Sequence, residues 1–151
     1  MIDDLNELWD VAIYKEIASQ ALYTASQKHT DNPAVVALLK ELVDEETNHV
    51  NILKSLKENG LKDSQYYKKE IRDLKMDEYL TAGGAVDGSS LQDIMVVAIN
   101  REQQSVEFYS HMLPNLNTPD AKKLCEMLIG QELKHKVKLE KMYDDLYYQE
   151  D

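Results

Sequence analysis

The feature that most constrains this chain is a Glu-x-x-His motif that occurs twice, once as Glu46 with His49 and once as Glu132 with His135. The two motifs are separated by the same number of residues, since 132 − 46 and 135 − 49 both give 86. The same shift aligns four further pairs: Glu16 with Glu102, Tyr23 with Tyr109, Pro33 with Pro119 and Leu42 with Leu128. Because residues three apart on a helix share one face, each motif can direct both side chains at one point. The repeat therefore predicts two copies of one helical hairpin, each supplying two glutamates and one histidine.

Composition and turn signals place four long helices in a single domain of residues 1–151. Leu, Ala, Glu and Lys are plentiful, whereas the chain has 5 Gly and 3 Pro, which favours helices. The expected first hairpin spans residues 4–59, the crossover 60–88 and the second hairpin 89–148. A crossover of this length exceeds the roughly 2–8 residues usual between bundle helices, so we expect it to run along the bundle and make the second and third helices parallel.

The expected helix ends carry recognisable capping residues. Asn32 before Pro33 and Thr118 before Pro119 each combine an N-cap with proline at the first helical position. Gly60 is a typical C-terminal stop. Ser89 or Ser90 is expected to cap the third helix.

Charge and cysteine content exclude several classes of protein. With 17 basic and 28 acidic residues the formal charge is −11, which argues against nucleic acid and anionic membranes as partners. A single cysteine excludes a disulfide framework or a Cys-x-x-Cys metal knuckle. No apolar run approaches the roughly 20 residues of a membrane span, and the acidic N-terminus is unlike a signal peptide. We expect a cytoplasmic protein.

Alternating steps of four and three residues define a core seam on each expected helix, apolar at its ends and polar in its middle. The midpoint between Glu16 and Glu46 in the sequence is residue 31, and the midpoint between Glu102 and Glu132 is residue 117. Both midpoints lie in turns that we expect between the helices of a hairpin. In an antiparallel hairpin, residues equidistant from the turn lie side by side. We therefore expect the two glutamates of each hairpin to be neighbours.

Four glutamates and two histidines at one level of a core require compensation. Each buried carboxylate costs several kcal/mol unless it is paired, and four would offset roughly the 5–15 kcal/mol that stabilises a domain. Two divalent cations would balance the four charges, and carboxylate with imidazole suits iron, manganese or zinc. The alternative is solvated surface charge with two chance motifs, which the shared 86-residue offset makes much less favoured.

At these residues the chain resembles the ferritin-like superfamily, and within it the rubrerythrin-type di-iron proteins. The resemblance implies an all-α, ferritin-like four-helix bundle that holds two iron ions, as Glu and Glu-x-x-His motifs do in such bundles. Glu46 and Glu132 would bridge the metals and Glu16 and Glu102 would be terminal ligands. His49 and His135 would each bind one metal, and Tyr23 and Tyr109, one heptad after the terminal glutamates, would contact ligands or oxidant.

Three features of the chain depart from the relatives it resembles. Rubrerythrins carry an extra carboxylate three residues after the third-helix glutamate, where this chain has Ser105. They also carry a four-cysteine rubredoxin module, which one cysteine cannot form, so electrons are expected from a separate donor such as a rubredoxin-like protein. The six-ligand set resembles the bacterioferritin centre, but Thr47 replaces its haem-ligating methionine, and no haem is expected.

Three functions remain open at this stage. The resemblance implies an oxidoreductase that reduces hydrogen peroxide or dioxygen at a di-iron centre. The first alternative is a ferroxidase or iron-handling protein, and the second is a non-catalytic helical interaction domain. A homodimer is also expected, since the helices carry further apolar residues, among them Ile13, Ile17, Val96 and Ile99, that could form a dimer face or pack on the crossover.

Overall fold

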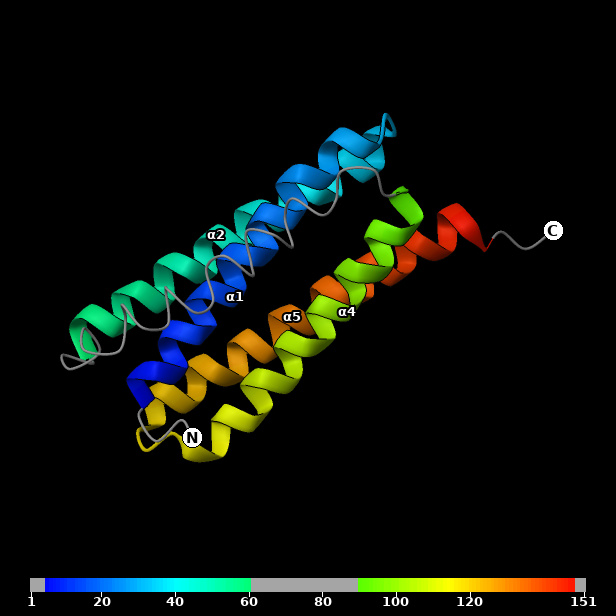
Figure 1. Ribbon diagram of the computed structural model, residues 1–151. Coiled ribbons are helices and arrows are strands. Elements are labelled where there is room, and N and C mark those ends of the chain that lie inside the picture. The colour runs from blue at the N-terminus through cyan, green and yellow to red at the C-terminus, as the bar shows by residue number, and fades with distance from the viewer. Residues whose placement is uncertain (1–4, 61–89, 149–151) are drawn as a thin grey trace. The chain divides into compact units, whose positions relative to one another are not determined.

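The computed structural model describes residues 5–60 and 90–148, and these residues form helices without any strand (Figure 1). The four α-helices are α1 (Leu5–Ser26), α2 (Pro33–Gly60), α4 (Leu91–Met112) and α5 (Pro119–Tyr147), with short 3-10 turns η1 (Gln27–His29) and η3 (Leu113–Asn115). The crossover expected after Gly60 lies outside the described residues. Among the helices described, none has the length and apolar character that a membrane span requires.

The described residues divide into two compact units, residues 5–60 and residues 90–148. In the first unit α1 packs along α2, and in the second unit α4 packs along α5, each pair antiparallel (Figure 1). The hairpins therefore coincide with the two copies of the sequence repeat, and each hairpin begins and ends within a few residues of its expected bounds.

Capping side chains begin three of these helices as expected. Asn32 Oδ1 accepts a hydrogen bond of 2.9 Å from the Ala34 N–H at the start of α2. The Thr118 hydroxyl accepts one of 3.2 Å from the backbone N–H of α5, and the Ser90 hydroxyl accepts one of 3.1 Å from that of α4. Each cap satisfies a backbone donor that the first helical turn leaves without an intrahelical partner.

The predicted core seams are buried in both hairpins. In the first unit the apolar members include Trp9, Ala12, Tyr23, Val35, Leu39, Leu42 and Leu53, and in the second they include Met95, Ala98, Tyr109, Met112, Cys125, Leu128 and Leu139. The polar middle of every seam is buried as well. Among the seam residues whose burial the structure describes, partial exposure is confined to the ends of the seams, at Leu56, Leu91, Met142 and Leu146.

A buried ion pair joins α1 to α2 in the first unit, where the seams did not predict it. Lys57 Nζ contacts the carboxylate of Asp10, and these residues are only 7% and 2% exposed. The residues 86 positions later are Val96 and Tyr143, so the second hairpin has no equivalent pair. The two copies of the repeat therefore have the same triad residues in their buried middle, but different residues at the positions of the Asp10–Lys57 pair.

We expect Lys57→Met to lower the free energy of unfolding by roughly 3–5 kcal/mol, because it leaves the Asp10 carboxylate buried without its cation. The double variant Asp10→Val, Lys57→Met should recover most of this loss, since an apolar pair replaces the charges. Urea unfolding measures both variants, with Lys54→Met on the exposed face of the same helix as the matched control. Equal effects of Lys57→Met and the control would contradict the assignment of a stabilising pair.

Candidate metal centre

In the first unit Glu16 of α1 meets Glu46 and His49 of α2, and we call these residues the first triad. His49 Nδ1 lies 3.2 Å from Glu16 Oε2 and 3.9 Å from Glu46 Oε2. The three side chains are at most 1% exposed. One ligand atom of each lies within 4.8 Å of those of the other two, so the pairing that the hairpin midpoints predict for the two glutamates is confirmed.

The second unit repeats this arrangement with Glu102 of α4 and with Glu132 and His135 of α5, the second triad. His135 Nδ1 lies 3.3 Å from Glu102 Oε2 and 3.3 Å from Glu132 Oε1. These side chains are also at most 1% exposed, and their ligand atoms lie within 4.8 Å of one another. Each hairpin thus builds, from its own residues, a buried cluster of two carboxylates and one imidazole.

The separations within each triad suit ligands of one metal ion. Two ligands in adjacent positions at bond lengths of about 2.0–2.2 Å lie roughly 3 Å apart, close to the 3.2 Å and 3.3 Å between imidazole and carboxylate atoms here. Nitrogen and oxygen donors of this kind bind iron, manganese or zinc. The Nδ1 atom faces the carboxylates in both triads, so the two histidines present the same nitrogen.

The carboxylates change the titration of the second-triad histidine. Burial lowers the pKa of His135, but its close contacts with the Glu102 and Glu132 carboxylates outweigh burial and raise the pKa from 6.5 to about 10. The imidazolium then balances part of the negative charge of its triad. Because a metal binds the neutral imidazole, an arriving ion must displace this proton and take over its role in charge balance.

On α1 and α4 the seam residues near the triad glutamates are small or aromatic and are also buried. Tyr23 and Tyr109, one heptad after Glu16 and Glu102, are 0% exposed. Ser105, which stands where rubrerythrins carry an extra carboxylate, is 4% exposed. Each triad therefore has two carboxylates from its own hairpin and no third one at this position.

Thr47 and Cys125 bind backbone or side-chain groups near the triads. The Thr47 hydroxyl donates to Val43 O and accepts a 2.8 Å hydrogen bond from Gln20 Nε2, which links α2 to α1.

The Cys125 thiol is buried and contacts Tyr109 O at 3.1 Å. Burial raises the pKa of the Cys125 thiol to about 11, and the nearby Glu126 carboxylate adds to the shift. The thiol is therefore protonated at neutral pH and serves as core packing rather than as a nucleophile.

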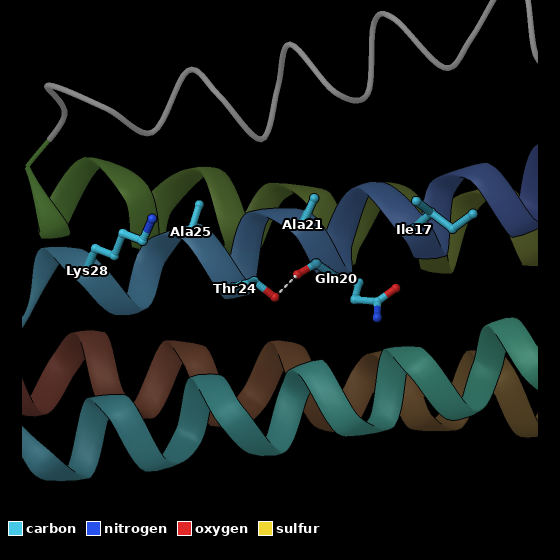
Figure 2. A pocket seen from close by; sticks show the side chains of 6 residues that line it. All are labelled: Ile17, Gln20, Ala21, Thr24, Ala25 and Lys28. Atoms are coloured by element: carbon cyan, nitrogen blue, oxygen red, sulfur yellow. Dashed lines mark hydrogen bonds between the residues drawn. The ribbon is translucent and has the colours of Figure 1, made fainter.

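A hollow on another face of α1 does not contribute to this chemistry. Its lining comes from α1 and η1 alone: Ile17, Gln20, Ala21, Thr24, Ala25 and Lys28 (Figure 2). The Thr24 hydroxyl donates to Gln20 O at 2.8 Å and so is engaged within the helix. The lining is mostly apolar and has one titratable side chain, Lys28, so it offers neither a metal ligand set nor an acid–base pair.

Sequence reasoning predicted all six residues of the two triads, and the structure brings them together three by three within their own hairpins. The remaining histidines lie elsewhere, His29 in η1 and His111 in the last turn of α4. The residues that the sequence did not single out are Asp10 and Lys57, because one copy of the repeat lacks them.

Comparison with known proteins identifies one family. The family model described as Rubrerythrin matches residues 7–143, a range that includes both triads and both tyrosines. Neither the curated proteins nor the solved structures contain a match.

Proposed function

The chain belongs to the rubrerythrin family, an all-α, ferritin-like family of di-iron proteins, and from this premise we propose that it is an oxidoreductase that reduces hydrogen peroxide or dioxygen. The observation that carries the proposal is the buried pair of triads, each with two carboxylates and one imidazole at separations that suit a metal ion. Buried charge of this density has no structural use of its own, because apolar side chains would fold the hairpins better.

We assign the two triads to one dinuclear centre with two iron ions per chain. Glu46 and Glu132 are proposed to bridge the ions, since each belongs to a Glu-x-x-His motif and can share its two oxygens. Glu16 and Glu102 are the proposed terminal ligands, and each histidine binds one ion. Four carboxylates balance two divalent ions, which removes the electrostatic cost of burying them.

Two bound ferrous ions would supply the two electrons that hydrogen peroxide and two protons need to form two water molecules. The protein's contribution is to hold the ligands in a buried setting and to exclude competing groups. Tyr23 and Tyr109 are proposed to hydrogen-bond the ligand carboxylates or the oxidant, which keeps them oriented. The electrons for the next cycle are proposed to come from a separate donor, such as a rubredoxin-like protein.

A ferroxidase or iron-handling role is the second candidate function, because Ser105 stands where rubrerythrins carry an extra carboxylate. Without a carboxylate at this buried position, the ligand set stays at three residues per hairpin. A ligand set that is the same in both hairpins also suits iron that enters as ferrous ion, is oxidised and then leaves. In that case iron is the substrate rather than the resident cofactor.

An anaerobic Fe(II) titration tests the metal centre. The native protein is expected to saturate near two ions per chain, and Glu46→Ala, Glu132→Ala to lose tight binding because both bridging carboxylates are gone. The matched control is Glu41→Ala, Glu140→Ala, which removes two more exposed carboxylates from the same helices, α2 and α5. Binding that survives in the first variant, or an absence of tight binding by the native chain, would contradict the proposal and favour a helical interaction domain.

Mixing the fully reduced, iron-loaded protein with oxidant separates the two functions. A peroxide reductase is expected to consume one peroxide per two ferrous ions, to keep its iron and to be reduced again through several cycles. Tyr109→Phe should slow this reaction by about tenfold or more if the hydroxyl assists proton delivery, while Tyr143→Phe on α5 serves as the control. Loss of ferric iron from the protein after one cycle would instead favour the ferroxidase.

A further inference from the structure

The helix α5 carries a concentration of lysines that the sequence repeat does not explain. Six of the chain's 17 basic residues lie in this one helix, although the formal charge of the chain is −11. The residues 86 positions earlier, in α2, are all uncharged. The six pairs are Lys122 with Val36, Lys123 with Ala37, Lys134 with Asn48, Lys136 with Val50, Lys138 with Ile52 and Lys141 with Ser55. The lysines are therefore a feature of α5 itself rather than of the repeated hairpin.

Four of these lysines share the side of α5 that is opposite its buried seam. Residues three, four or seven positions apart lie on one side of a helix. The residues of α5 that these spacings connect, which we call the lysine face, are Lys123, Met127, Gly130, Lys134, Val137, Lys138 and Lys141. All of them are exposed except Lys138, which is half-buried. Among nearby acids, Glu126 is exposed beside the face and Glu140 pairs with Lys136 at 3.8 Å.

Two acidic positions of α2 have uncharged counterparts on the lysine face. Glu41 and Asp44 are exposed on α2, and the residues 86 positions later are Met127 and Gly130. Gly130 lies inside a 29-residue helix, where glycine is less favourable than alanine because it loses more backbone entropy. A Cβ atom built there would meet nothing within 4 Å, so packing in the described part of the chain does not require glycine. Its missing side chain lets a partner approach the helix backbone closely.

The lysine face lies behind the second triad. Glu132 and His135 belong to the same helix but are on its buried side, and Gly130 and Lys134 are within two residues of them along the chain. A helix with its side chains is about 10–12 Å across, so a redox group that docks at Gly130 is separated from the ligands by about this thickness. Because electron tunnelling slows steeply with distance, such a short separation suits electron delivery.

We propose that the lysine face binds an acidic protein that carries single electrons, and that this protein reduces the iron centre through α5. The inference rests on the proposed function, for which it names the chemistry and docking place of the electron donor. Carboxylates of the donor pair with Lys123, Lys134 and Lys141, and its redox group lies against Gly130. In each encounter the donor is oxidised by one electron and one ferric ion is reduced to ferrous ion, so two encounters restore the reduced centre.

A single helix face suits a partner of this kind. Weak electron-transfer complexes have the smallest specific interfaces, since the donor must leave after each electron, and complementary charge guides their encounter. From Lys123 to Lys141 the face is about 27 Å long, and exposed acids lie beyond both ends, Asp120 before it and Asp144 after it. A nucleic acid or a membrane surface would extend over these carboxylates, whereas a small acidic protein fits between them.

Carbodiimide cross-linking tests the docking surface with a readout that needs no turnover. The reagent joins a lysine amine directly to a carboxylate that contacts it. The iron-loaded protein is mixed with a rubredoxin of net negative charge, and mass spectrometry is expected to find cross-links mainly at Lys123, Lys134 and Lys141. The exposed Lys40 and Lys54 of α2 are the internal controls. An absence of cross-links, or cross-links as frequent on α2 as on α5, would overturn the proposal.

Charge reversal tests whether the lysine face guides electron delivery. The variant Lys134→Glu, Lys141→Glu is compared with Lys40→Glu, Lys54→Glu, because each replaces two exposed positive charges with negative ones and so changes the net charge equally. Stopped-flow measures the second-order rate at which the reduced rubredoxin reduces the ferric protein.

At low ionic strength the α5 variant should be slower than the α2 variant by about tenfold or more, because only the former loses the attraction at the docking surface. The difference should disappear in about 1 M salt, where the Debye length is about 3 Å. Equal rates of the two variants at low ionic strength would overturn the proposal.

Oxidation of the chemically reduced native protein by peroxide separates a failure of this proposal from a failure of the proposed function, because that step needs no donor. If peroxide oxidises the ferrous protein but rubredoxin does not cross-link to α5, the docking proposal fails and the function stands. If peroxide does not oxidise it, the proposed function fails and this inference fails with it.

Vesicles of phosphatidylglycerol and phosphatidylcholine are a second anionic probe. The native protein is not expected to sediment with them. Co-sedimentation that Lys134→Glu, Lys141→Glu abolishes would assign the lysine face to a membrane surface and overturn the proposal.

Discussion

The structure depends on the placement of four carboxylates and two imidazoles in the buried middle of otherwise apolar seams. Each triad is at most 1% exposed, and a buried carboxylate without compensation costs several kcal/mol. The apolar seam residues on either side of the triads stabilise the folded hairpins. The buried charge of the triads lowers the stability of the hairpins until that charge is balanced. Metal binding and folding are therefore expected to be coupled, as they are wherever an ion binds ligands that folding brings together.

Much of this arrangement was predictable because it obeys periodic rules. The 86-residue repeat predicted the two hairpins, and the seams predicted many of their buried residues, including the buried polar ones of the triads. Asn32 and Thr118 predicted helix starts because capping is a local property of the chain. Asp10 and Lys57 were not predicted, because a charged residue beside a seam is normally a surface residue and only the packing of α1 against α2 shows otherwise.

The two hairpins agree where they face the triads and differ elsewhere. The first buries an ion pair at Asp10 and Lys57, whereas the second has Val96 and Tyr143 at the same positions of the repeat. The second hairpin also exposes apolar side chains around Gly130. The buried faces repeat because each hairpin supplies the same set of ligands. The outer faces carry no ligands, so their residues can differ between the hairpins.

The central proposal is that the two triads hold one dinuclear centre, and electron paramagnetic resonance of the iron-loaded, oxidised protein tests it most directly. Two ferric ions that shared the Glu46 and Glu132 carboxylates would couple antiferromagnetically. The account therefore predicts no signal from isolated high-spin ferric iron, and a mixed-valent signal after partial reduction. A strong isolated ferric signal that accounts for all bound iron would show that each triad binds its ion separately, and would contradict the account.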